Sequence, residues 1–123
     1  MSLKQQKSNA LRFVNKVRKA LKREPISKLP LGIPQDAKRC SLALGVEDVT
    51  VEGGDIVFEY AVQAYVVAEA LGYQDNKMDD GNSLVLPKEV NRFTKSFDNL
   101  KFPELVDIQT LLDNQEPDSS SVW

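Results

Sequence analysis

Basic side chains recur at helical spacing near the start of the chain, and their chemistry is the recognition of anions. At 100° per residue, four of them fall on one side of a helix and form a basic ridge: Arg12, Lys16, Lys19 and Arg23. Arg18 and Lys22 fall on its flank. Such a ridge can be a solvated helix face, a set of contacts to nucleic-acid phosphates, or the complement of an acidic protein surface.

A group of acidic residues lies in a segment that alternates apolar and polar residues on both sides of Gly53-Gly54. This pattern predicts two antiparallel strands, because adjacent glycines permit the positive φ angles of a type I′ turn. In that register Glu52 faces Asp55, and Asp48 faces Glu59. Like-charged cross-strand pairs are mildly destabilising unless a cation compensates. A solvated sheet face and a surface that receives basic residues of the first helix, from this chain or a partner, both fit the pattern.

The residue types that carry most enzyme chemistry are scarce. The chain has no histidine, the commonest general base and transition-metal ligand. Its single cysteine, Cys40, follows two basic residues that could lower its pKa, but a buried position in the core is the favoured interpretation. The acidic loop at 75–83 lacks the ligands that an EF-hand needs, and Gly53-Gly54 lacks the Lys and Ser/Thr of a phosphate-binding loop. We therefore expect no enzyme activity, cofactor or metal site.

The composition is that of one soluble globular domain, with 123 residues of which 41% are hydrophobic and 28% charged. We expect this domain over 1–115 and a flexible tail over 116–123. Residues 1–39 hold eleven Lys/Arg and two acids, whereas 40–123 hold five Lys/Arg and sixteen acids. This asymmetry is typical of a polyanion-binding arm or of a basic segment that docks on an acidic body. The lone cysteine and the lack of a long apolar run favour the cytoplasm and no membrane association.

The first third of the chain predicts two helices and a connector. Apolar residues at helical spacing indicate an amphipathic helix over about 8–23, with a stripe of Ala10, Val14, Val17 and Leu21. Prolines and apolar residues over 25–36 indicate an extended, packed connector. A short helix over 37–44 follows, capped by Asp36 and ended by Gly45, with Cys40 and Leu44 facing inward.

The remainder predicts a small antiparallel sheet covered by helices, and hence an α+β fold. The hairpin buries Val49, Val51, Ile56 and Phe58 under an apolar helix that runs from about Ala61 to Gly72. A polar loop over 73–83 leads to a short apolar segment, 84–86, that can add a third strand. Two more helices follow, each opened by a proline: one from Pro87 with Val90, Phe93 and Phe97 inside, and one from Pro103 with Leu105, Ile108 and Leu112 along one side.

The order of several short motifs resembles a group of small uncharacterised proteins of actinobacteria and their phages, over roughly residues 29–106. The motifs are Arg39-Cys40-Ser41-Leu42-Ala43, the hairpin, Leu86-Pro87 before a helix, Phe97-Asp98, and Phe102-Pro103-Glu104-Leu105-Val106. The resemblance implies a stand-alone bacterial or phage protein, in the host cytoplasm if it is a phage protein. It assigns no activity.

These patterns favour a non-enzymatic interaction protein that self-associates or binds a protein partner. The candidate contacts are the basic and acidic residues already noted: Arg12, Lys16, Arg18, Lys19, Lys22, Arg23, Glu52 and Asp55. In the self-association hypothesis, the first helix docks through its apolar stripe on its own body or on another copy. The ridge then meets acids such as Glu52 and Asp55 of a neighbouring chain. A nucleic-acid-binding accessory or regulatory protein is the alternative, and no small-molecule substrate is expected.

Overall fold

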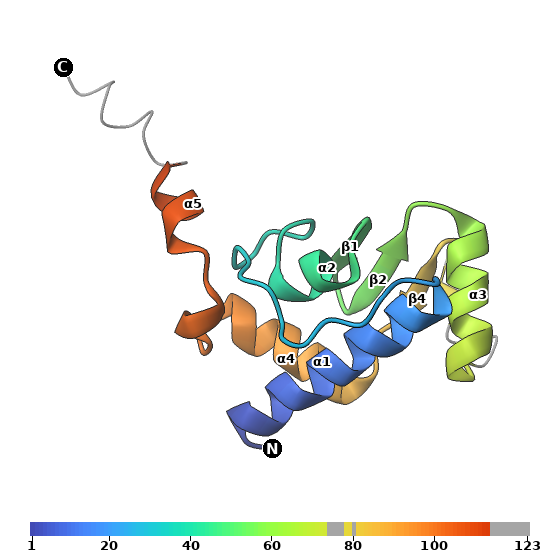
Figure 1. Cartoon of the computed structure of the whole chain (residues 1–123), viewed down its shortest axis with the longest axis horizontal. Helices are drawn as coiled ribbons and strands as arrows, with labels where there is room; N and C mark the ends of the chain where they lie inside the picture. The colour runs from blue at the N-terminus through green and yellow to red at the C-terminus, as the bar shows by residue number, and fades with distance from the viewer. Residues whose placement is uncertain (74–77, 80, 114–123) are drawn as a thin grey trace.

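The structure, a computed structural model, describes residues 1–73, 78–79 and 81–113, and it confirms the α+β fold. In chain order its elements are α1 (Leu3–Ala20), α2 (Ser41–Val46), β1 (Val49–Glu52), β2 (Asp55–Phe58), α3 (Ala61–Leu71), β3 (Met78–Asp79), β4 (Ser83–Val85), α4 (Lys88–Asp98), the 3-10 helix η2 (Pro103–Leu105) and α5 (Ile108–Asp113). The expected flexible tail lies outside the described residues. Figure 1 shows the helices α1 to α4 around the sheet, with α5 projecting from the body.

The four strands form one antiparallel sheet in the order β1-β2-β4-β3. The hairpin register is confirmed: Val49 pairs with Phe58 and Val51 with Ile56, and all four side chains are buried. Gly53 and Gly54 have the positive φ angles, 59° and 84°, that the turn demands. The predicted third strand is β4. The additional strand β3 lies in a segment that the sequence indicated as a loop, because its polar residues carry no alternation signal.

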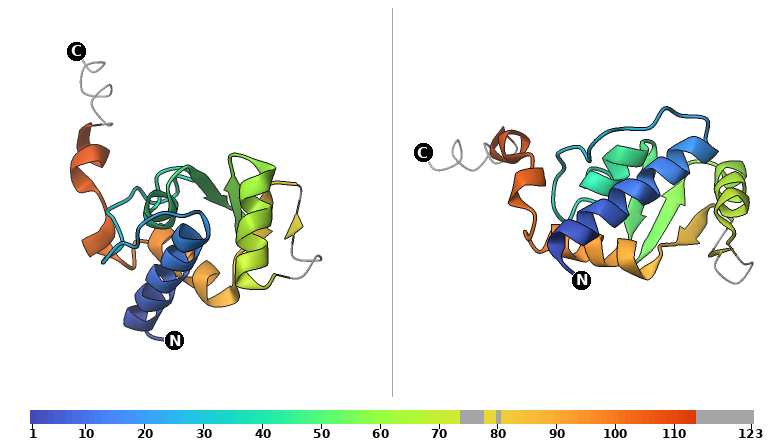
Figure 2. Two further views of the ribbon diagram at one scale, coloured as in Figure 1. Left: turned by 45° about the vertical axis from the view of Figure 1, so that its right-hand side comes forward. Right: turned by 60° about the horizontal axis from the view of Figure 1, so that its bottom comes forward.

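Helix α1 has the predicted amphipathic centre but different ends. It begins five residues earlier, because the Ser2 hydroxyl accepts a hydrogen bond from the Gln5 amide at 3.1 Å and caps the first turn. It ends at Ala20, since Lys22 adopts a left-handed φ of 64°. The stripe residues Ala10, Val14 and Val17 are fully buried. The helix packs against α2, α3 and α4 of its own chain (Figure 2), so the stripe is covered intramolecularly.

Helix α2 begins later than expected, and Asp36 does not cap it. One Asp36 carboxylate oxygen accepts the amides of Lys38 and Arg39 at 3.0 Å each, which makes a turn ahead of the helix. Cys40 is the N-cap residue instead, and its sulfur accepts the Ala43 amide at 3.4 Å. Cys40 is buried as predicted, whereas the prediction for Leu44 is wrong because this side chain is exposed. Gly45 lies inside the helix rather than at its end.

Helices α3 and α4 follow the sequence closely. Gly72 ends α3 with a left-handed φ of 77°. Helix α4 begins after Pro87 and buries Val90, Phe93 and Phe97, as expected. Helix α2 contacts β1, while α3 contacts β2 and β4. Helices α1 to α4 and the buried face of the hairpin thus contribute to one hydrophobic cluster.

The predicted helix from Pro103 is two separate elements, η2 and α5. Gly32 of the connector forms a parallel bridge with Val106. Its amide donates to Leu105 and its carbonyl accepts from Asp107, both at 2.8 Å. This pairing holds the chain in an extended conformation between the two helices. Leu105 is buried, but Ile108 and Leu112 are each 58% exposed, so the prediction of one continuous apolar side is wrong.

Candidate interaction site

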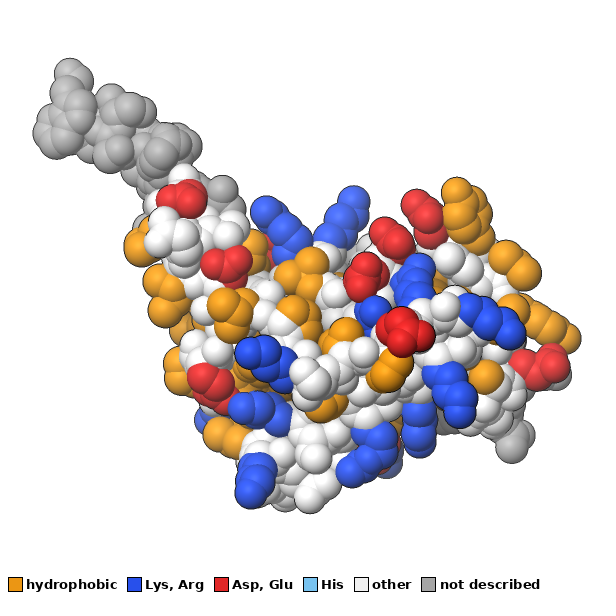
Figure 3. All heavy atoms as spheres, viewed as in Figure 1, with side chains coloured by type: hydrophobic (Ala, Val, Ile, Leu, Met, Phe, Trp, Pro, Cys, Tyr) orange, Lys and Arg blue, Asp and Glu red, His pale blue; other side chains and the backbone are white. Residues whose placement is uncertain are grey.

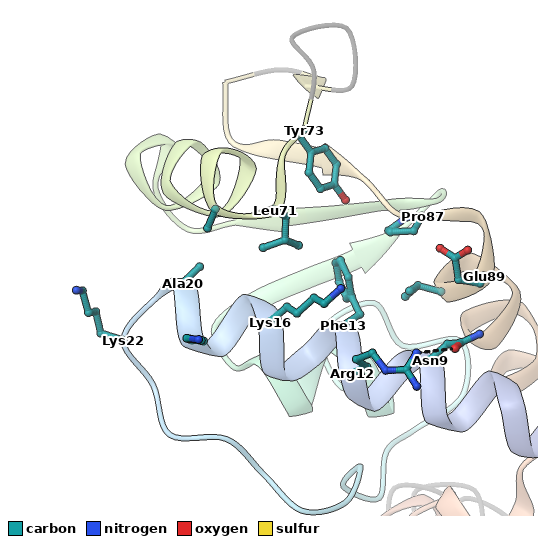
Figure 4. Close-up of a pocket in the computed structure, with 13 residues that line it drawn as sticks. Asn9, Arg12, Phe13, Lys16, Ala20, Lys22, Leu71, Tyr73, Pro87 and Glu89 are labelled. Carbon is teal, nitrogen blue, oxygen red and sulfur yellow. Dashed lines mark hydrogen bonds between the residues drawn. The ribbon is translucent and has the colours of Figure 1, made fainter.

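Basic residues of α1 border a groove of about 860 Å³ between α1, the end of α3 and the start of α4. Arg12, Lys16 and Lys19 are exposed on α1, and Lys22 follows in the turn after it. Figure 4 shows α1 along one side of this basic groove, with Leu71, Tyr73, Pro87 and Glu89 across from it. The spacing of three and four residues therefore places the cations along one wall.

The floor of the basic groove carries apolar side chains. Its lining includes Phe13, Leu71, Pro87 and Val90, which come from α1, α3 and the start of α4. The Tyr73 hydroxyl donates to the carbonyl of Val85 at 2.8 Å, which holds the ring in place. Burial raises the pKa of this hydroxyl to about 12, and the Glu89 carboxylate acts in the same direction. Tyr73 is therefore a neutral wall of the groove and not a base.

The cations of the basic groove are largely uncompensated. In the described part of the chain, Lys16, Lys19 and Lys22 form no ion pair, and Arg12 donates to the Asn9 side chain at 3.2 Å. Ion pairs elsewhere hold Lys7, Arg18, Arg23 and Arg39. Glu89 is the acid that lines the groove opposite the four cations. A concave site with this charge excess attracts anionic groups.

Arg18 does not belong to this exposed set, which corrects the sequence-based assignment. Its side chain is only 9% exposed. Its Nε donates to the carbonyl of Glu24 at 2.6 Å, and its Nη1 donates to the carbonyl of Gly45 at 2.8 Å and to the Glu47 carboxylate at 2.7 Å. The physical reason is that a cation is favoured at the C-terminus of a helix, here α2, where carbonyls lack helical partners.

Arg23 is likewise turned inward rather than lying on the ridge. Because α1 ends at Ala20, the chain turns back and Nη1 of Arg23 donates to the carbonyls of Val46 and Glu47 at 2.7 Å each. Its Nη2 also lies 3.5 Å from the Asp48 carboxylate. The acidic pair that follows α2 is the sequence signal that could have indicated this intramolecular role.

One acid of the hairpin, Asp55, lies beside the basic groove. Glu52 and Asp55 pair across the strands as predicted, and Glu52 is exposed. Asp55 lines a second hollow of about 610 Å³ that shares Leu71, Tyr73 and Pro87 with the basic groove. Asp48 has a left-handed φ of 62° and precedes β1, so the predicted Asp48–Glu59 pair is not part of the ladder.

The outer face of α3 is an apolar surface that was not predicted from the sequence. It is defined by Val62, Tyr65, Val66 and Ala70. Val62, Tyr65 and Val66 are 66%, 61% and 41% exposed. Ala70 also lines the basic groove, so the two surfaces are continuous. Figure 3 shows hydrophobic side chains gathered over α3 and basic ones along the edge formed by α1. Because α3 is apolar on nearly all sides, its sequence does not indicate which side is exposed.

Cys40 lies apart from this surface, in the core. Burial raises the pKa of its thiol, despite the hydrogen bond from the Ala43 amide. Lys38 and Arg39 do not produce a reactive thiolate. Among the described residues, no cluster of three or more His, Cys, Asp or Glu is arranged to hold a metal ion.

Comparisons of the chain with protein-family models, curated proteins and solved structures give no match. In the described ranges, none of the helices has the length and apolar character needed to span a membrane.

Proposed function

We propose that the protein is a non-enzymatic interaction protein of the cytoplasm, and that its basic groove binds an acidic segment of a protein partner, either another copy or a different protein. One observation carries this proposal: cations without ion-pair partners among the described residues stand over an apolar floor. A bound segment that presents carboxylates and apolar side chains together satisfies both parts of the groove. Carboxylates gain charge-assisted contacts, and the apolar side chains leave water.

Nucleic-acid binding is the second candidate, because cations spaced along one helix can follow a phosphate backbone. One feature makes it the weaker one. A sugar-phosphate chain brings no aliphatic side chains to the floor formed by Phe13, Leu71 and Val90. Glu89, which also lines the groove, repels phosphates and carboxylates alike and does not discriminate between the two candidates. The apolar floor therefore favours a peptide.

Fluorescence anisotropy with two labelled probes tests the proposal. The probes are a short peptide of glutamate with leucine at every fourth position, and a short duplex DNA of random sequence. We expect the peptide to bind, more weakly as salt screens the charges. The triple variant Lys16→Glu/Lys19→Glu/Lys22→Glu should abolish binding.

The matched control is Lys28→Glu/Lys95→Glu/Lys101→Glu, which makes the same change in net charge at exposed positions outside the groove. This control should retain at least about half of the wild-type affinity for the peptide. An equal loss of affinity for the peptide in both triple variants would show that net charge alone determines binding. Binding of DNA without binding of the peptide would favour the nucleic-acid candidate instead.

A further inference from the structure

The C-terminal helix α5 has the complementary chemistry to the basic groove. It is the described α-helix in which no residue is buried. Ile108 and Leu112, one helical turn apart, are both 58% exposed. Residues 102–113 hold no Lys or Arg and three acids: Glu104, which pairs with Lys7 of its own chain at 3.0 Å, Asp107 just before α5, and Asp113 within it. This segment therefore presents apolar side chains within an acidic stretch.

The receiving surface combines the same two properties with opposite charge. The outer face of α3 offers Tyr65 and Val66 with Glu69 beside them, and it meets the basic groove, where the cations outnumber the acids, at Ala70. Lys19 and Lys22 line the groove together with Ala70 and Leu71 of α3. With α5 laid there, its apolar side chains lie against α3, and Asp113 and the preceding Asp107 lie near the lysines. The match is one of charge and of apolar surface together.

The α5 helix cannot reach the groove of its own chain. Figures 1 and 2 show α5 projecting from the end of the molecule opposite α3. Two hydrogen bonds to Gly32 and the buried Leu105 fix the chain just before it. Only a second copy can bring α5 to this surface.

We propose that α5 of one copy docks on the basic groove and the adjoining outer face of α3 of a second copy. This inference rests on the proposed function and names the partner. It assigns the acidic role to α5 rather than to Glu52 and Asp55, because the apolar side chains beside those acids, Val51 and Ile56, are buried in their own sheet. The contact joins two different surfaces, so it closes a dimer if exchanged reciprocally and otherwise forms chains. A contact built on one short helix is small, and we expect weak, concentration-dependent association.

Light scattering over a range of protein concentrations at low salt tests this docking. We expect the mass of the wild type to rise with concentration and to fall back as salt is added. Lys16→Glu/Lys19→Glu/Lys22→Glu removes the receiving surface, and Ile108→Ser/Leu112→Ser removes the docking helix. Each variant alone should stay monomeric, while the control Lys28→Glu/Lys95→Glu/Lys101→Glu should associate.

Mixing the two monomeric variants is the decisive step. The first retains an intact α5 and the second an intact basic groove, so the mixture should form a one-to-one complex. Failure of the mixture to associate, or a wild type that stays monomeric at high concentration, overturns the docking of α5. The proposed function has a separate readout, because the Ile108→Ser/Leu112→Ser variant should still bind the glutamate-leucine peptide.

Discussion

Arg18 donates hydrogen bonds from a nearly enclosed position on α1 to two carbonyls and to the Glu47 carboxylate. Arg18→Met should therefore lower the free energy of unfolding by about 1.5–3 kcal/mol, which is the value of a hydrogen bond that involves a charged group. The loss is not larger because the Glu47 carboxylate is exposed and is solvated by water once Arg18 is removed. Urea unfolding measures this change. Lys19→Met on the exposed side of the same helix is the control, with an expected change within about 0.5 kcal/mol. Equal effects of both substitutions would contradict the structural role of Arg18.

Glu47 gives this contact a dependence on pH. The hydrogen bond from Arg18 lowers the pKa of its carboxyl below the ordinary value of 4.5. Because the folded-state pKa is the lower one, the stabilisation is complete above 4.5 and is lost as the pH falls through the folded-state pKa. The contribution is small, since Glu47 is mostly exposed.

The Glu47→Gln variant isolates the contribution of the Glu47 carboxylate to stability. At neutral pH it should unfold more readily than the wild type, and below pH 4.5 the two proteins should approach the same stability. Asp36, Glu104 and Asp107 also have lowered pKa values, so the difference between wild type and variant is the quantity to follow. A difference that stays constant over this pH range would remove Glu47 from the acid response.

Among the elements, the hairpin agrees with the sequence in its turn, in its register from Val49 to Phe58 and in its buried face. Phe58 lies on its buried face at 2% exposure, and Phe58→Ala should cost about 3–5 kcal/mol as a core truncation. Val57→Ala, on the opposite and partly exposed face of the same strand, should cost much less. Chemical denaturation compares the two, and similar midpoints would mean that the strand is stabilised by its backbone rather than by this face.

Elements with a single apolar face could be predicted because their pattern has one solution. This holds for the hairpin, for the centre of α1 and for α4. The start of α2 could not be predicted, since both Asp36 and Cys40 can satisfy backbone amides and only the tertiary fold decides between them. The break before α5 depends on Gly32, which lies far away in the sequence.

The candidate site was predictable to a similar degree. Helical spacing correctly placed Arg12, Lys16 and Lys19 on an exposed face. It could not reveal that Arg18 and Arg23 lie against the end of α2, because that contact joins two elements whose packing is not encoded locally. The apolar wall contributed by α3 was likewise hidden by the uniform composition of that helix.

At the scale of the whole molecule, α5 adds nothing to the core of its own chain. Deleting residues 108–123 should therefore leave the thermal unfolding midpoint nearly unchanged, since α5 has no buried residue. Leu105→Ala, just before it, should destabilise the protein by about 2–5 kcal/mol, because Leu105 is buried. Calorimetry on both variants measures this contrast. A large drop in the unfolding midpoint on deletion would mean that α5 stabilises the monomer and is not a free arm.

The packing of α1 against α4 also bears on how the protein emerges from the ribosome. Synthesis makes Ala10, Val14 and Val17 well before the α4 residues, and at about 5–20 residues per second the gap lasts several seconds. During that interval α2 and α3 can already cover part of the apolar stripe, but the side that α4 covers stays exposed to water. This exposed apolar surface makes the growing polypeptide prone to aggregation until α4 is made.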